Sequence, residues 1–245
     1  MLPLLRIFGL TIQTPLLASL LGFSIGLYLV TQIGATRQFD PNILSSAGFY
    51  GLIVGVAGSR IGYVIANIRS YAAEPLSALM PGTTAMLPVV GWITGIVFGV
   101  IYLYRKKLLK IELLDIASPG IAFLLAGSAA SSFLSGDDFG TVANLPWSVY
   151  LWGEWRHPVQ LYELIASCAL VVLLYQSLQR QLPDGTSLLL LIGLYGFTRT
   201  VIDAYRVESI VVLGVRLSQV VGVSAAVLAF WLIGQLDLRH PKLDA

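Results

Sequence analysis

Seven long apolar tracts follow one another along the chain, separated by short polar stretches. An apolar tract of about 20 residues can cross a bilayer as an α-helix, because a helix bonds its own backbone polar groups internally. The pattern therefore predicts an all-α polytopic membrane protein with about seven transmembrane helices. The tract containing Asp115 and Pro119 fits this pattern less well, and so does the short tract that ends in Arg199 and Asp203. The tracts cover roughly residues 9–33, 43–67, 86–104, 113–133, 159–178, 186–203 and 211–235.

The composition supports a membrane protein. Hydrophobic residues make up 56% of the chain and charged residues only 11%, against roughly 25% charged residues in ordinary soluble domains. The net charge of +2 is too small to suggest a nucleic-acid partner. No sharp break in composition divides the chain, so we expect one integral membrane domain over residues 1–245. No cluster of cysteine and histidine suggests a metal, and we expect no cofactor.

Positive charges on the loops predict the orientation. Seven spans place the termini on opposite sides, and the side richer in Lys and Arg is normally cytoplasmic. The C-terminal side holds eight such residues and the N-terminal side five. We therefore expect the N-terminus outside, the C-terminus in the cytoplasm and the loop at about 134–157 outside the cytoplasm. The eight are Arg37, Arg105, Lys106, Lys107, Lys110, Arg180, Arg239 and Lys242, and the five are Arg6, Arg69, Arg156, Arg206 and Arg216.

Two groups of polar residues lie inside or beside the apolar tracts. Arg60 lies within the second tract, where an arginine either faces a polar interior or extends to the interface. Tyr195, Arg199, Asp203 and Arg206 are spaced by four, four and three residues, which places them on one helical face. These arginines either form ion pairs that hold helices together or bind an anion such as phosphate.

A third polar group surrounds the start of the fifth tract. The group comprises Asp137, Asp138 and Glu154 from the loop, and Arg156, His157, Gln160, Tyr162 and Glu163 from RHPVQLYE. His157 either accepts a proton near neutral pH or bonds nearby backbone at a helix start. Together the three groups predict a cationic polar interior, open to the outer side, that suits an anionic substrate or a phospholipid head group. A transporter for anions is a weaker alternative, because no inverted repeat is visible.

Several motifs resemble those of the prolipoprotein diacylglyceryl transferase family. HPVQLYE (157–163) resembles the family's HPTQLYE, and GSRIGYV (58–64) is similar to GxRLGYV. YGFTRTVIDAYR (195–206) resembles YGxxRFxxExxR. The family's GRxGNFxNxExxG would fall at SAASSFLSGDDFG (128–140), where Phe133, Gly136 and Gly140 keep the register and Ser132 and Ser135 replace the asparagines. The resemblance implies a bacterial inner-membrane enzyme. Its substrates would be phosphatidylglycerol and a prolipoprotein signal peptide, whose lipobox cysteine would receive the diacylglyceryl group through a thioether.

The resemblance also implies residue roles. Arg199, His157 and Asp137 would be catalytic, with Asp137 at the place of the family's glutamate. The substrate-binding residues would be Arg60, Tyr195, Arg206, Asp203, Gln160, Glu163, Ser135 and Gly140. The chain departs from the family pattern where Ala129, Val89 and Pro15 replace an arginine, a histidine and a tyrosine. Two interpretations follow: a transferase with a reorganised site, or a homologue that binds phospholipid or signal peptide, or transfers to another acceptor.

Overall fold

The chain forms two compact units. The computed structural model describes residues 4–7, 10–73, 86–180, 182–207, 211–212 and 215–239. The larger unit comprises Met1–Val30 and Ile111–Ala245, and the smaller unit comprises Thr31–Lys110. The expectation of one integral membrane domain stays a prediction.

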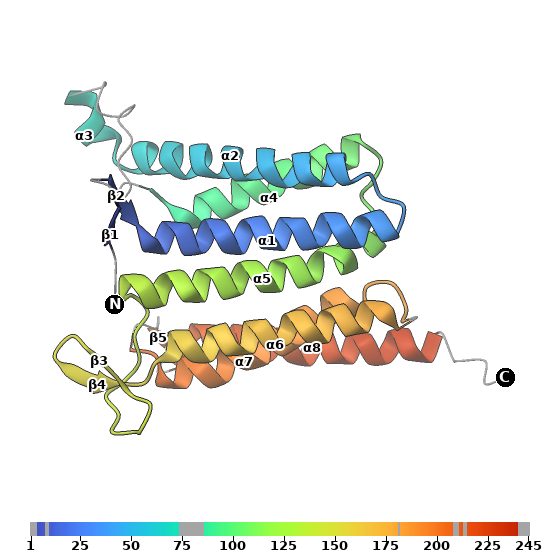
Figure 1. Cartoon of the computed structure of the whole chain (residues 1–245). Helices are drawn as coiled ribbons and strands as arrows, with labels where there is room; N and C mark the ends of the chain where they lie inside the picture. Colours follow the sequence, from blue (N-terminus) through green and yellow to red (C-terminus); the bar gives the residue numbers. More distant parts are fainter. Residues whose placement is uncertain are drawn as a thin grey trace. The chain divides into compact units, whose positions relative to one another are not determined.

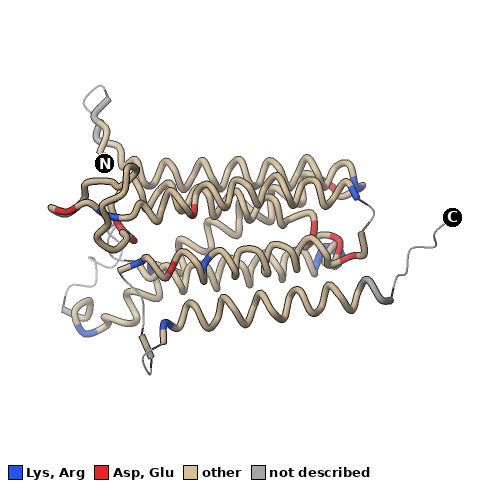
Figure 2. Tube along the Cα trace, turned by 90° about the horizontal axis from the view of Figure 1, so that it is seen from below, with Lys and Arg blue, Asp and Glu red and all other residues tan. Residues whose placement is uncertain are grey.

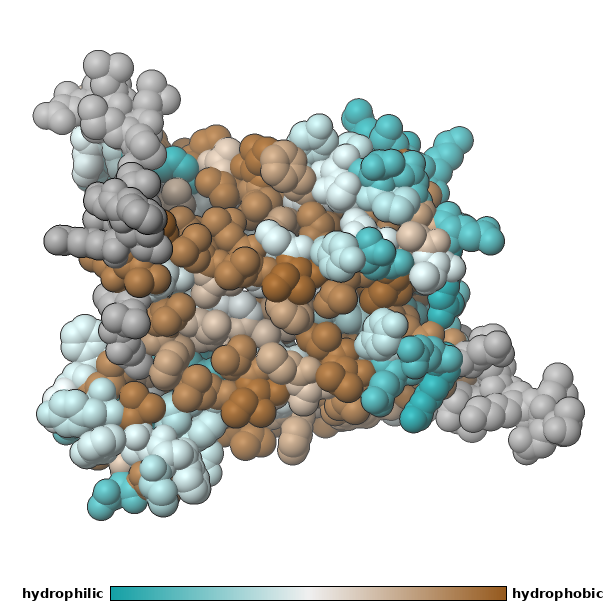
Figure 3. Space-filling view, in the orientation of Figure 1, coloured by the Kyte–Doolittle hydropathy of each residue, from teal (hydrophilic) through white to brown (hydrophobic). Residues whose placement is uncertain are grey.

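Seven of the described helices are long and apolar enough to cross a membrane (Figure 1). This confirms the predicted all-α polytopic fold. Large hydrophobic side chains on these helices are exposed, as lipid-facing residues would be, and they cover the helix sides in Figure 3. Most Lys, Arg, Asp and Glu lie near helix ends (Figure 2). The seven are α1 (Thr14–Thr36), α2 (Pro41–Ala66), α4 (Pro88–Arg105), α5 (Ile111–Ser135), α6 (Val159–Gln179), α7 (Thr186–Ile202) and α8 (Leu217–Arg239).

The remaining elements are short. They are the helix α3 (Ile68–Ala73), the 3-10 turn η2 (Asp203–Tyr205) and three antiparallel hairpins. The first and last spans begin later than predicted, because residues at the start of both apolar tracts pair as strands instead. The hairpins are β1 (Leu4–Ile7) with β2 (Leu10–Gln13), β3 (Val149–Leu151) with β4 (Glu154–Arg156), and β5 (Val211–Val212) with β6 (Val215–Arg216).

In the smaller unit, glycines bring α2 and α4 together. A Cβ added at Gly55 would lie 2.9 Å from the carbonyl oxygen of Gly91, and one at Gly95 would lie 2.8 Å from that of Gly51. Small residues allow this approach, which supports van der Waals packing between helices in a membrane. The two backbones therefore leave no room for a methyl group at this crossing.

We expect Gly95→Ala to lower the free energy of unfolding by about 1–3 kcal/mol, the usual cost of overpacking. Gly99→Ala, one turn further along the same helix, is the matched control. The nearest atom to a Cβ there is the Ala47 carbonyl oxygen at 4.0 Å, so this change should be neutral or stabilising by up to about 1 kcal/mol. Unfolding in detergent micelles measures both, and equal effects would contradict the proposed close packing.

In the larger unit, α5 packs against α6, and α7 lies against both α6 and α8. Ala122 on α5, Leu170 and Leu174 on α6 and Leu191 on α7 form a buried apolar cluster. Gln219 on α8 donates its Nε2 hydrogen to the Thr200 carbonyl oxygen at 3.2 Å. This packing fixes α6 and α7 side by side.

Asp115, the unexpected acid of the fourth tract, caps another helix. Helix α7 begins after Gly185, which has no side chain to cap it. Asp115 instead accepts the backbone N–H groups of Gly185 at 2.6 Å and Leu188 at 2.8 Å. Pro119 cannot donate to the Asp115 carbonyl four residues earlier, and Ser118 Oγ donates to that carbonyl at 2.7 Å. The Asp115 carboxylate and the Asp115 carbonyl oxygen, which Pro119 leaves without a helical donor, therefore both have partners within the protein.

Asp115→Ala is expected to destabilise the larger unit by about 1–3 kcal/mol, because two backbone N–H groups at the start of α7 lose their acceptor. Asp115→Asn keeps one acceptor oxygen and should lose less. Lys110→Ala is the control, because Lys110 is exposed and directly precedes α5, the helix that contains Asp115. Denaturant unfolding in micelles measures the three variants. A loss for Asp115→Ala no larger than for Lys110→Ala would contradict the cap.

Candidate active site

Glu163 is the centre of a polar cluster in the larger unit. It lies in the second turn of α6 and is largely buried. Its Oε1 accepts hydrogen bonds from Tyr195 Oη and from Arg199 Nη1, both at 2.9 Å. Its Oε2 accepts one from Arg206 Nη2 at 2.8 Å. One carboxylate thus connects α6 to three predicted site residues on and beyond α7.

Asp203 and Arg206 follow α7 in a tight turn. Asp203 begins η2, and Arg206 directly follows it. Asp203 Oδ1 lies 3.0 Å from Arg206 Nε and 3.3 Å from Arg199 Nη2. Neither Asp203 oxygen has a well-aligned hydrogen bond, although the distances are those of ion pairs. Asp203 therefore interacts with both arginines through charge and not through directed hydrogen bonds.

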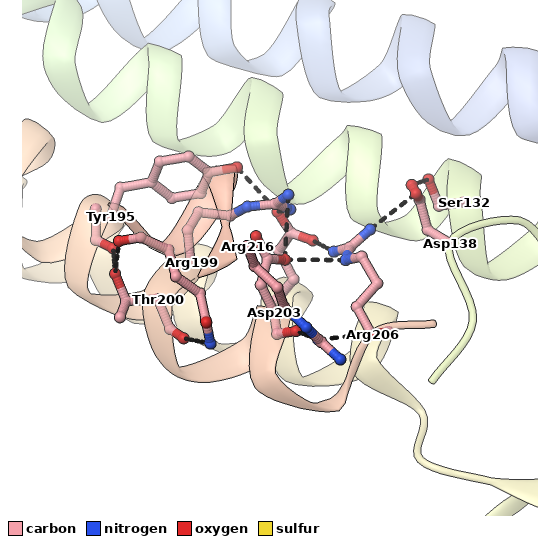
Figure 4. Close-up of polar contacts among 11 residues, drawn as sticks. Ser132, Asp138, Tyr195, Arg199, Thr200, Asp203, Arg206 and Arg216 are labelled. Carbon is pink, nitrogen blue, oxygen red and sulfur yellow. Dashed lines mark hydrogen bonds and ion pairs between the residues drawn. The ribbon is translucent and has the colours of Figure 1, made fainter. Parts of the chain in front are cut away.

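Three further residues support this turn (Figure 4). Arg206 Nη1 lies 2.8 Å from Asp138 Oδ1, and Ser132 Oγ donates to Asp138 Oδ2 at 3.0 Å. Arg216 Nη1 donates to the carbonyl oxygens of Asp203 and Arg206. From the sequence, Asp138 was one of the polar loop residues without a role of its own, and Ser132 and Arg216 were not site candidates. The motif comparison named Asp137, at the place of the family's glutamate, whereas the carboxylate that meets Arg206 belongs to Asp138.

The two arginines of the cluster differ in exposure. Arg206 has a side chain only 4% exposed, and its three guanidinium nitrogens each face a carboxylate: Nε faces Asp203, Nη1 faces Asp138 and Nη2 faces Glu163. The side chain of Arg199 is 28% exposed. Arg206 is therefore enclosed by its partners, whereas Arg199 keeps an accessible surface that a ligand can reach.

The loop after α5 closes on the cluster through its backbone. Gln160 Nε2 donates to the Asp137 carbonyl oxygen at 2.6 Å, while the Asp137 side chain is exposed. Ser135 Oγ donates to the Ser132 carbonyl oxygen at 3.2 Å near the end of α5. Gly140 forms a β-bridge with Arg206, and a Cβ there would lie 2.4 Å from the His157 carbonyl oxygen. Only glycine fits this position without a shift.

His157 lies beside the turn that leads to Arg206. Its Nδ1 is 3.2 Å from Tyr162 Oη, and its ring centroid is 4.8 Å from that of Tyr205. Glu154, a candidate assistant of His157, is ion-paired with Arg156 at 2.5 Å. His157 is thus held by two tyrosines, and one of them precedes Arg206 directly.

Arg60 belongs to the smaller unit, where its guanidinium lies 5.6 Å from the ring centroid of Tyr71. Its part in the site stays a prediction. Among the described residues, no group of three or more His, Cys, Asp and Glu side chains could hold a metal ion. Ala129, at the place of the family's arginine, is buried in α5.

Comparison with known proteins identifies the family. The model of the family described as prolipoprotein diacylglyceryl transferase matches residues 3–234. A protein of Trichormus variabilis named phosphatidylglycerol–prolipoprotein diacylglyceryl transferase is 28% identical over 257 residues, covering 98% of this chain and 88% of the relative. A protein of the same name from Finegoldia magna is 27% identical, covering 89% of this chain and 88% of the relative. The matched residues include the polar cluster and nearly all of the seven apolar helices. The chain therefore belongs to the prolipoprotein diacylglyceryl transferase family.

Proposed function

We propose that the protein transfers the diacylglyceryl group of phosphatidylglycerol to the thiol of a lipobox cysteine in a prolipoprotein signal peptide. The cysteine sulfur would form a bond to the glyceryl carbon, the bond from that carbon to the phosphate oxygen would break, and glycerol phosphate would leave. The observation that supports this most is the cluster of Arg199, Glu163 and Arg206 in a membrane-spanning member of this family.

Arg199 is the proposed phosphate ligand. Its guanidinium contacts Glu163 through Nη1 and Asp203 through Nη2, and its side chain is 28% exposed. A planar guanidinium fits phosphate oxygens, and the negative charge of the phosphate grows as the leaving group departs. Arg206 would position Glu163 and Asp203 and would not itself bind the lipid, because its side chain is only 4% exposed. Tyr195 and Glu163 would hold the orientation of Arg199.

The remaining residues complete the proposed site. His157 would accept the thiol proton, with Glu154 or Asp137 assisting, since the thiolate is the stronger nucleophile. Arg60, Gln160, Ser135 and Gly140 would contribute to substrate binding. The signal peptide would enter laterally from the bilayer of the bacterial inner membrane, with the N-terminus of the enzyme outside and its C-terminus in the cytoplasm.

His157→Gln is expected to slow thioether formation by about 10²–10⁴-fold, the usual contribution of general acid–base catalysis. Tyr162→Phe is the comparison, because it keeps the imidazole and removes a hydroxyl that contacts His157 Nδ1 and accepts from Trp147 Nε1; we expect a smaller loss of rate. Initial rates at saturating lipid measure both variants. An unchanged rate for His157→Gln would assign His157 a structural role and leave the proton acceptor elsewhere.

A second candidate function is binding without this chemistry. Ala129, Val89 and Pro15 stand where the family pattern has an arginine, a histidine and a tyrosine. Loss of a group that stabilises charge in the transition state typically costs about 10²–10³-fold in rate. A homologue that binds phospholipid or signal peptide, or that transfers to another acceptor, would retain the Glu163 cluster and lose the usual reaction.

One reconstitution separates the two functions. The purified protein is placed in vesicles that contain phosphatidylglycerol, and a lipobox peptide is added together with a control peptide whose cysteine is replaced by serine. Mass spectrometry then searches for the diacylglyceryl thioether. We expect the adduct on the cysteine peptide alone. Absence of the adduct, with lipid still bound to the protein, would overturn the transferase and favour the binding function.

A further inference from the structure

Four large aromatic side chains are exposed on the segment between α5 and α6. Trp147, Tyr150, Trp152 and Trp155 are each more than half exposed. Single exposed aromatic residues are ordinary on protein surfaces, but several on one short segment indicate an interaction surface. We call this set, on and beside the hairpin β3–β4, the aromatic hairpin surface.

The hairpin that carries this surface has a defined conformation. Its two-residue turn is Trp152-Gly153, with φ of 55° and 83°, and positive φ at both positions is typical of a type I′ turn. On the other edge of β4, Ala143 N donates to the Trp155 carbonyl oxygen at 2.9 Å. The Arg156 guanidinium lies 4.9 Å from the ring centroid of Phe139. The aromatic residues therefore lie on a hairpin whose conformation is fixed by its turn and by contacts with the neighbouring loop.

Two of the indoles are fixed to the ends of membrane spans. Trp147 Nε1 donates to Tyr162 Oη at 2.8 Å, and Tyr162 lies in the first turn of α6. Trp152 Nε1 donates to the Gly136 carbonyl oxygen at 3.2 Å, and Gly136 directly follows α5. Both indole N–H groups are thus satisfied within the protein, while both rings stay exposed at the level where two spans end.

We propose that the aromatic hairpin surface lies in the interfacial region of the same bilayer that α5 and α6 cross. Tryptophan and tyrosine prefer this region, because it accommodates an apolar ring beside polar groups. The depth of the two indoles in the bilayer follows from their hydrogen bonds to Tyr162 and Gly136, at the ends of α6 and α5. The ligand is therefore a lipid surface and not a separate protein. The proposal rests on the spans and does not depend on the transferase activity.

The proposed contact also affects the site. The same loop supplies Asp138 to Arg206 and the Gly140 bridge. Further hydrogen bonds join Thr141 N to the Tyr205 carbonyl oxygen at 2.7 Å and Val207 N to that of Phe139 at 3.2 Å. A hairpin seated in the interface would therefore hold this loop against the turn that carries Arg206.

The test uses the full chain in phosphatidylglycerol-containing vesicles, with one tryptophan left in each variant. A Trp147-only and a Trp152-only variant are made by Trp→Phe changes at the other positions. The Trp231-only variant is the matched control, since Trp231 is exposed on the span α8. The quenchers are lipids brominated near the glycerol end of the acyl chain, lipids brominated near its methyl end, and aqueous iodide.

For Trp147 and Trp152, we expect a larger loss of fluorescence with bromines near the glycerol end than with bromines near the methyl end, and little loss with iodide. Strong quenching by iodide, with none by either brominated lipid, would place the hairpin in water and overturn the proposal. Shielding from iodide that appears only after a lipobox peptide is added would also overturn it, because the surface would then bind peptide.

Discussion

Glu163→Ala is expected to lower the free energy of unfolding by about 3–5 kcal/mol, the usual cost of removing one partner from a buried ion pair. The change leaves Arg199 and Arg206 without the carboxylate that both contact, and it removes the acceptor of the Tyr195 hydroxyl. Asp203 and Asp138 remain but lie against other guanidinium nitrogens. Denaturant unfolding in detergent micelles measures the loss.

Tyr195→Phe is the matched control for this variant. It removes one hydrogen bond to the same carboxylate oxygen without leaving a charge unpaired, so we expect a loss of about 1 kcal/mol. Glu163→Gln should fall between the two, because it keeps the shape of the side chain and loses its charge. If Glu163→Ala proved no more destabilising than Tyr195→Phe, Glu163 would not be the centre of the cluster.

The sequence predicted the spans well because the bilayer imposes a simple rule on length and polarity. The tract that contains Asp115 and Pro119 was the doubtful one, and α5 nevertheless forms there. Its acid is satisfied by N–H groups about 70 residues away in the chain, at the start of α7. A local stretch of sequence shows that Asp115 is charged, but it does not show that this residue caps the start of α7.

The polar cluster was predicted in part. The spacing of Tyr195, Arg199, Asp203 and Arg206 indicated one shared face, and the structure brings all four together around Glu163. The 3-10 turn η2 changes the helical path after Ile202. The orientation of Arg206 therefore could not be derived from a continuous helix. The motif comparison chose Asp137, whereas the carboxylate that meets Arg206 is that of Asp138, where the backbone has a positive φ of 55°.

Arg199→Lys and Arg206→Lys are expected to fail in different ways, although both keep the positive charge. Lysine has no planar fork, so it cannot reproduce two directed contacts at once. At Arg199 we expect the rate of thioether formation to fall by about 10²–10³-fold with unfolding little changed, because that side chain keeps an accessible surface. At Arg206 we expect loss of stability first, by about 1–3 kcal/mol, because a lysine ammonium cannot contact all three carboxylates that surround the guanidinium.

The comparison requires the rate and the unfolding free energy of both variants in the same vesicles or micelles. Arg105→Lys is the control, since Arg105 is exposed in the last turn of α4 and should tolerate the change. The two arginines share Glu163 and Asp203, so the distinction rests on the greater exposure of Arg199 and on the additional contact of Arg206 with Asp138. Equal loss of stability at Arg199 and Arg206 would make Arg199 a second structural clamp, and the phosphate ligand would then have to be sought outside this cluster.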